Sequence, residues 1–186
     1  MTFRNFPSRP IAFSLLVLAC LPGCRSATDA LSAKTTLTLT SSSITNGQVV
    51  RTITCDGANT SPDLAWSALP PATRSLALLF TDPDAPGVTF THWTLFNIPA
   101  EARSLPAALP TTAQLSDGSR QGHNDFDATG YGGPCPPGHS PHRYVFNLYA
   151  VDILLDLPPG ATRQQIEEAL KGHVLASGQL TGRYSH

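Results

Sequence analysis

The sequence predicts a single, mainly β domain with a minor helical part. The chain has 186 residues, which fits one domain with a sizeable core. It contains 17 Pro and 14 Gly, a composition that favours a loop-rich β fold over a helical bundle. Short apolar runs, each bounded by turn residues, recur along the chain and predict strands.

The charge pattern argues against two classes of protein. The 12 basic and 13 acidic residues are scattered singly, so the chain lacks the basic stripe that a nucleic-acid-binding protein needs. Intrinsic disorder is disfavoured because apolar runs cover most of the sequence.

Residues 1–23 have the pattern of a lipoprotein-type signal peptide. Arg4 and Arg9 form a basic start without an acidic residue, and an apolar stretch follows at 11–21. As a helix this stretch would rise only about 16 Å, too little for a hydrocarbon core of about 30 Å. The segment therefore predicts export rather than a membrane span.

The sequence Leu21-Pro22-Gly23-Cys24 resembles a bacterial lipobox, in which the cysteine is acylated and becomes the mature N-terminus. Cys24 is the expected lipidation site, and a plain signal cleavage nearby is the alternative. Residues 24–35 are small and polar and predict a flexible tether, followed by a folded domain at 36–186. The expected location is the bacterial cell envelope, anchored to the membrane by lipid on the periplasmic side.

The remaining cysteines predict one disulfide. Removal of the signal peptide removes Cys20, and acylation uses Cys24, which leaves Cys55 and Cys135. A remaining pair in an exported domain favours a disulfide over two free buried thiols. Closing a loop of about 80 residues would stabilise the fold by about 4 kcal/mol in the chain-entropy model.

The first half of the domain predicts strands. Strict alternation predicts a strand at 36–40, and shorter strands are expected at 49–54 and 64–66, before and after the turn-forming residues 56–62. Two strong strands follow at 75–81 and 92–98. The first of these is almost continuously apolar, so both of its faces should be covered.

The second half begins with a long loop at 99–137, whose length indicates a functional or disordered segment. Its end at 129–137 is dense in Gly and Pro and should be ordered. The longest strand is expected at 143–153. Thr162 and Gln165 form a capping box for a helix reaching about residue 175, and a final strand is expected at 177–184.

Two loops carry the residues that could do chemistry. The first contains Asp82 and leads to His92, and the second spans 130–137 and leads to His142. Each is stiffened by proline and ends in a histidine at the start of a strong strand. Two such histidines on neighbouring strands, with an aspartate at the end of a third, should converge on one small polar pocket.

Such a pocket would suit a phosphate-like or carboxylate-like group. Imidazoles can donate or accept hydrogen bonds, and the amides of a Gly-Gly turn can form an anion-binding nest. Asp82 would orient one imidazole or accept from a protonated ligand atom. The competing interpretation is that these strings are ordinary turns with incidental histidines.

Four motifs in order then resemble a known family. They are Cys55-Asp56-Gly57-Ala58-Asn59-Thr60-Ser61-Pro62, Asp82-Pro83-Asp84-Ala85-Pro86 with His92-Trp93, Gly130-Tyr131-Gly132-Gly133-Pro134-Cys135-Pro136-Pro137, and His142-Arg143-Tyr144. Together they resemble the phosphatidylethanolamine-binding protein family, most closely its bacterial Raf-kinase-inhibitor-like branch. The resemblance covers residues 37–184.

The resemblance implies a mainly β fold with minor α content, in which a large antiparallel sheet packs on a smaller sheet and a helix lies near the C-terminus. It implies a small anion pocket for phosphate, phosphorylethanolamine or similar phospholipid headgroups. Carried over by motif position, the ligand-binding residues would be Asp82, His92, Gly133, Pro134, His142 and Tyr144.

The resemblance also assigns supporting roles. Asp84 and Pro86 would structure their loop, with Ala85–Pro86 as a candidate cis bond. Arg143 would pair with one of the loop aspartates. No catalytic residue, metal ligand or cofactor is expected.

The leading hypothesis is therefore a non-enzymatic binding protein. The alternative is a protease inhibitor or an envelope regulator that acts on a protein partner through surface loops, although the sequence specifies no such partner. An enzymatic role is a third possibility, because two histidines and a carboxylate could hold iron or catalyse hydrolysis. It is disfavoured because the motifs of nucleophile elbows, zinc proteases and P-loops do not occur.

Overall fold

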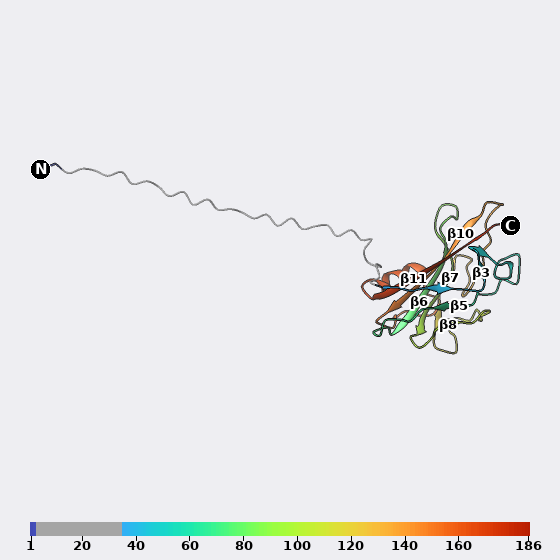
Figure 1. The fold of residues 1–186 in the computed structure, drawn as a ribbon, viewed down its shortest axis with the longest axis horizontal. Coiled ribbons are helices and arrows are strands. Elements are labelled where there is room, and N and C mark those ends of the chain that lie inside the picture. Colours follow the sequence, from blue (N-terminus) through green and yellow to red (C-terminus); the bar gives the residue numbers. More distant parts are fainter. Residues whose placement is uncertain (3–34) are drawn as a thin grey trace.

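The computed structural model describes residues 1–2 and 35–186, and residues 35–186 form two sheets and one helix (Figure 1). The expected mainly β fold is confirmed. The predicted signal peptide from residue 3 onward, the lipidation site Cys24 and nearly all of the predicted tether lie outside the described residues. The last tether residue, Thr35, already belongs to the first strand.

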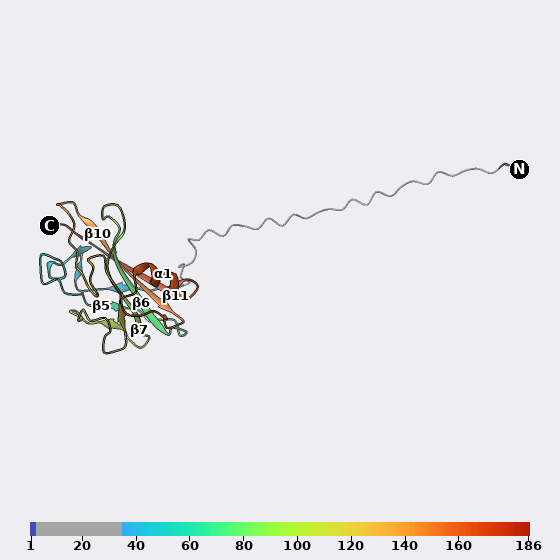
Figure 2. The ribbon, with the colours of Figure 1, turned by 180° about the vertical axis from the view of Figure 1, so that it is seen from behind.

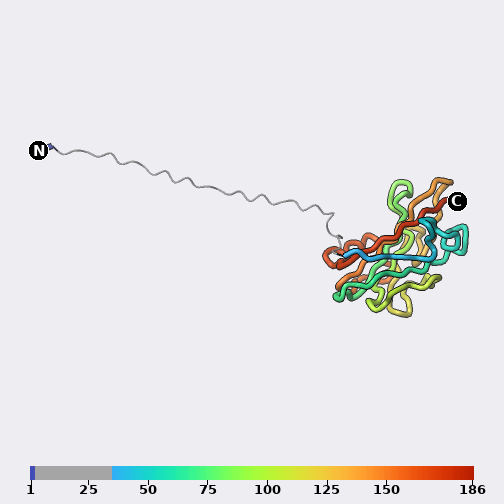
Figure 3. Tube along the Cα trace, in the orientation of Figure 1, coloured from blue at the N-terminus to red at the C-terminus, as the bar shows by residue number. Residues whose placement is uncertain are grey.

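The large sheet has eight strands in the order β3-β4-β11-β10-β6-β7-β9, with β1 also paired to β11. Its long strands pair antiparallel, whereas the short β1 and β4 run parallel to β11. Figure 3 shows the start of the domain lying beside the C-terminal strand. The strands are β1 (Thr35–Thr36), β3 (Ile44–Thr45), β4 (Gln48–Val49), β6 (Ser75–Asp82), β7 (Phe90–Pro99), β9 (Arg120–Gln121), β10 (His142–Val151) and β11 (Val174–Tyr184).

The small sheet has three strands in the order β2-β5-β8, namely β2 (Leu39–Thr40), β5 (Leu64–Trp66) and β8 (Ser104–Leu105). It packs on one face of the large sheet through a core that includes Leu64 and Phe80. The helix α1 (Arg163–Leu170) packs on the other face, which Figure 2 shows from behind.

Strand β6 is buried on both faces, as its continuous apolar sequence predicts. Leu78 and Phe80 belong to the core shared with the small sheet. Ala77 and Leu79 belong to a second core, where they pack with helix residues such as Ile166. Because successive side chains of a strand point to opposite faces, only a run without polar residues can fill both cores.

Two short elements near the N-terminus differ from expectation. The strand predicted at 36–40 is divided: β1 pairs with β11, and β2 pairs with β5 in the other sheet. The strand predicted at 49–54 ends at Val49, and Arg51–Ile53 form a 3-10 helix. The Thr54 backbone N–H and hydroxyl both donate to the Arg51 carbonyl oxygen, which closes this turn.

The helix α1 begins as predicted, with a capping box between Thr162 and Gln165. It ends at Leu170, earlier than expected, because Gly172 adopts a φ of 82° and turns the chain. Strand β11 therefore starts at Val174 rather than 177. Within the described part of the chain, no helix is both long enough and apolar enough to span a bilayer.

The long segment 99–137 is ordered around a buried glutamine. The Trp93 indole N–H donates to Gln121 Oε1 over 2.7 Å. Gln121 Nε2 in turn donates to the carbonyl oxygens of Pro110 and Thr112, each over 2.7 Å. A side chain in β9 thus satisfies backbone groups of the loop, which also contributes strand β8.

The expected disulfide joins Cys55 to Cys135 across a sequence separation of 80 residues. Hydrogen bonds support it on both sides. The Cys55 N–H donates to the Pro134 carbonyl oxygen over 3.0 Å, and the Tyr131 hydroxyl donates to the Ile53 carbonyl oxygen over 2.7 Å. The Gly/Pro-rich segment 129–137 is therefore attached to the 3-10 helix region.

Replacing both cysteines, Cys55→Ser with Cys135→Ser, should lower the free energy of unfolding by about 4 kcal/mol, because the unfolded chain gains the freedom that the cross-link removes. Urea unfolding of the oxidised protein and of the double variant measures this difference. Equal unfolding midpoints, or two titratable thiols at these positions in the non-reduced protein, would contradict the cross-link.

Candidate functional site

Asp82, His92 and His142 meet at one end of the large sheet because of strand order. Strand β6 lies between β7 and β10 and pairs antiparallel with both. The end of β6 therefore lies beside the start of each neighbour, with Asp82 opposite Phe90 on β7. The three side chains therefore lie at one end of the sheet, but the two strands that carry the histidines flank the strand of Asp82 and are not, as had been expected, neighbours of each other.

The Asp82 carboxylate is bound from two sides. Oδ2 lies 2.7 Å from His142 Nδ1, and Oδ1 accepts from the Asp84 N–H over 2.8 Å. Asp82 is 3% exposed and His142 is 8% exposed. The hydrogen bond to Asp82 fixes the orientation of the His142 ring.

His92 is oriented by the backbone of the Gly-rich segment. Its Nδ1 donates to the Gly132 carbonyl oxygen over 2.8 Å, and the Gly132 N–H donates back to the His92 carbonyl oxygen over 2.9 Å. Burial lowers the pKa of His92 below its usual value of 6.5, against the opposing effects of the Gly132 carbonyl and Asp82. At neutral pH the ring is therefore uncharged, and Nε2 is a hydrogen-bond acceptor.

Tyr144 lies beneath both histidines and is fully buried. Its ring centroid is 5.3 Å from that of His92 and 6.5 Å from that of His142. Its hydroxyl has no hydrogen-bond partner among the described residues. Burial, and then the charge of Asp82, raise the pKa of Tyr144, so the hydroxyl keeps its proton and can donate.

A cavity of about 230 Å³ opens at this end of the sheet. Asp82 and His92 supply its ionisable groups. His142 and Tyr144, which were expected to bind the ligand, do not line this cavity, because the His142 ring is bonded to Asp82 and Tyr144 is fully buried. Most of the remaining wall is apolar. The lining residues are Asp82, Ala85, Pro86, Phe90, His92, Phe126, Cys135 and Pro137.

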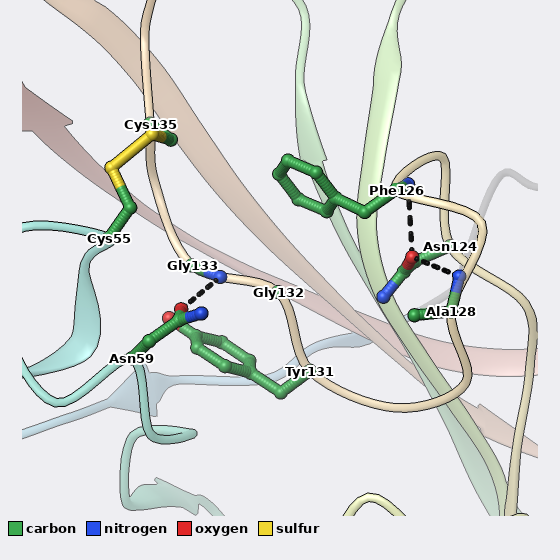
Figure 4. Close-up of a pocket in the computed structure, with 9 residues that line it drawn as sticks. All are labelled: Cys55, Asn59, Asn124, Phe126, Ala128, Tyr131, Gly132, Gly133 and Cys135. Carbon is green, nitrogen blue, oxygen red and sulfur yellow. Dashed lines mark hydrogen bonds between the residues drawn. A yellow bond between two sulfur atoms is a disulfide. The ribbon is translucent and has the colours of Figure 1, made fainter.

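The anion nest expected from the glycine amides does not form. The Gly132 N–H is bonded to His92, and the Gly133 N–H donates to Asn59 Oδ1 over 2.8 Å (Figure 4). Gly133 lines a neighbouring cavity instead, and Pro134 lines neither of the two. A Cβ on Gly133 would lie 2.2 Å from the Ile53 carbonyl oxygen, so close backbone packing explains this glycine.

Asp84 structures its loop through Arg143, as expected. The guanidinium donates to both carboxylate oxygens, and the Arg143 N–H adds a bond of 2.8 Å. These bonds lower the pKa of Asp84 to about 2. The candidate cis bond at Ala85–Pro86 is not found: residues 35–186 contain no cis peptide.

Sequence reasoning missed three apolar residues of the wall, namely Phe90, Phe126 and Pro137. Phe126 offered the clearest signal, because it is a lone aromatic residue between two aspartates in a polar loop. It is 46% exposed, yet its ring packs edge-on against His92 with the centroids 5.3 Å apart.

The chain matches the family model described as phosphatidylethanolamine-binding protein over residues 40–185. It belongs to this family. Among solved structures, the putative phosphatidylethanolamine-binding protein homolog CT736 from Chlamydia trachomatis superimposes with a TM-score of 0.73 at 32% identity, covering 82% of this chain and 99% of that one. YbcL from Escherichia coli, described as a new member of the mammalian family, gives 0.71 at 34% identity, covering 81% and 98%.

Sequence relatives support the assignment of this chain to the family. A UPF0098 protein from Methanothermobacter thermautotrophicus is 49% identical over 138 residues, which cover 74% of this chain and 91% of the relative. A UPF0098 protein from Aquifex aeolicus is 44% identical over 147 residues, covering 77% and 85%. The match to the family model at 40–185 includes the strands and loops that build the cavity.

The titration of His92 tests the geometry of the site. Because its folded pKa is lowered, the unfolded chain binds more protons than the native protein between that pKa and 6.5. Stability should therefore rise with pH through this window and fall as the pH drops below about 6.5. Nuclear magnetic resonance of the His92 ring should give a midpoint below that of the urea-unfolded protein.

The variant His92→Gln should remove this part of the acid sensitivity. If the titration midpoint of His92 in the native wild-type protein is at or above its midpoint in the unfolded protein, the buried, neutral imidazole is contradicted.

Proposed function

We propose that this family member is an exported, non-enzymatic binding protein whose cavity takes a small phosphate-bearing ligand of the phosphorylethanolamine type. The observation that carries the proposal is that Asp82 and His92 line one largely apolar cavity. A hydrogen bond to His142 orients Asp82, and a hydrogen bond to the Gly132 carbonyl oxygen orients His92. Family membership supports a binding role.

The protonation states favour a ligand that brings hydrogen-bond donors as well as negative charge. Asp82 and the neutral His92 Nε2 both accept, so a protonated phosphate oxygen or an ammonium group suits them. A bound phosphate would also favour protonation of His92 by its charge. Binding should therefore take up protons, and affinity should increase from pH 8 to pH 6.

The alternative function, inhibition of a protease or regulation of an envelope protein through surface loops, is favoured by one observation. Val88 is 70% exposed in the loop between β6 and β7, whose base is held by the Asp84–Arg143 pair. A single exposed apolar residue is common on protein surfaces, so Val88 marks only where a protein partner would contact this loop.

Phosphate and phosphorylethanolamine should raise the melting temperature of the protein through the cavity, and acetate, which brings no hydrogen-bond donor, should raise it less. A ligand at about 100 times its dissociation constant adds about 2.7 kcal/mol of stability. Thermal shift measurements on wild type, His92→Gln and His142→Gln should show this increase in the wild type and its loss in both variants.

The matched control is His173→Gln. His173 also bonds an aspartate, Asp152, but lies at the opposite end of β11 from Tyr184, the residue that pairs with His142. It should respond like the wild type. No shift with any of the three ligands would contradict the anion pocket and leave the loop-mediated function as the better candidate.

We also propose that the domain is lipid-anchored through Cys24, which rests on the lipobox-like sequence. The variant Cys24→Ala, expressed with its own leader, should move from the detergent phase to the aqueous phase on partitioning. Cys20→Ala is the matched control and should remain with the detergent. Aqueous partitioning of the wild type would contradict lipidation.

A further inference from the structure

A second cavity, of about 270 Å³, adjoins the first. The two share a wall made by Phe126 and Cys135. The side chains and backbone drawn in Figure 4 enclose it: Gly132 and Gly133 on one side, Tyr131 and Asn59 below, and Ala128 opposite.

Phe126 separates the two cavities. Its ring packs edge-on against Phe90 and His92, with centroids 4.7 and 5.3 Å away. On its other side the ring lies so close to Gly132 that a Cβ there would be 2.5 Å from Phe126 Cδ2. A side chain at position 132 would clash with the Phe126 ring, so glycine at this position makes room for the ring between the two cavities.

The backbone that carries this ring is fixed, whereas the ring is half exposed. Asn124 Oδ1 accepts from the N–H groups of Phe126 and Ala128, over 3.0 and 3.2 Å. Asp125 pairs with Thr91 through both its backbone and its carboxylate. The side chain can therefore turn into solvent about its own bonds without rearranging the loop.

The walls of the second cavity are those of an aromatic-binding site. Two aromatic rings and the disulfide provide apolar surface, and the Tyr131 hydroxyl is already used by Ile53. Asn59 Oδ1 is bonded to Gly133, while its Nδ2 donates to no other described residue. A cavity of about 150 Å³ is enough to hold benzene, so a phenyl-sized group fits.

We propose that the second cavity takes the aromatic substituent of a phosphate monoester whose phosphoryl group occupies the Asp82–His92 cavity. Phe126 turns aside to let one ligand span both. The inference rests on the proposed function of the first cavity and adds the class of substituent that the site prefers.

Calorimetric titration with phenyl phosphate and methyl phosphate tests this preference, because the two ligands share the charged group and differ in the substituent. Wild type should bind phenyl phosphate at least tenfold more tightly. Ala128→Trp fills the second cavity from its far wall and should bring phenyl phosphate to within twofold of methyl phosphate. The affinity for methyl phosphate should stay unchanged.

The matched control is Ala72→Trp, the same change at an exposed alanine before the opposite end of β6. It should behave like the wild type. Ala128→Leu is a smaller filling that should reduce the phenyl preference if the tryptophan variant fails to fold.

The outcomes separate the two proposals. Two outcomes would overturn the proposed role of the second cavity. One is equal affinity of the wild type for both ligands, and the other is a preference for phenyl phosphate that persists in folded variants whose second cavity is filled. Loss of methyl phosphate binding in a folded filled variant would overturn it too, because the cavities would then not be separate. Failure of the wild type to bind either ligand would instead overturn the proposed function of the first cavity.

Discussion

The buried carboxylate of Asp82 is the constraint on which the site depends. A charge removed from water must be compensated by hydrogen bonds, and here the His142 ring and the Asp84 backbone supply them. His142 belongs to the neighbouring strand β10, and Asp84 belongs to the loop that follows β6. The carboxylate therefore joins the central strand, its neighbour and the Pro-rich loop into one unit.

This unit is rigid because the strand that carries Asp82 is buried on both faces. The small sheet covers one face and α1 covers the other, so β6 has little room to shift. The ring of His92 is fixed in turn by the Gly132 backbone. A preformed cavity of this kind loses little conformational entropy when a ligand binds.

Much of this arrangement could be predicted from the sequence because strand periodicity and strand-end position are local signals. The apolar run of β6 predicted its burial, and the positions of Asp82, His92 and His142 at strand ends predicted their meeting. The capping box located the start of α1. A pair between Arg143 and one of the loop aspartates was expected, and the structure identifies that aspartate as Asp84.

Other features depend on tertiary partners that local sequence does not specify. The glycine amides were expected to face a ligand. The Gly133 N–H instead donates to the side chain of Asn59, which is 74 residues away in the sequence. Phe126 entered the wall through contacts with Phe90 and His92 that no spacing rule indicates. The end of α1 was missed because the left-handed conformation of Gly172 outweighed the helical spacing of the apolar residues beyond it.

The pairing of β1 with β11 has a consequence for how an anchored molecule would present its cavity. Thr35 and Thr36 pair with Ala176 and Ser177, whereas His142 pairs with Tyr184 at the other end of the same strand. Ser177 and Tyr184 are seven residue steps apart along this extended strand, a span of about 24 Å. The chain leading from Cys24 thus enters the domain at the pole opposite the cavity mouth. A molecule anchored through its N-terminus would therefore carry the site on the side of the domain that lies away from the attachment point.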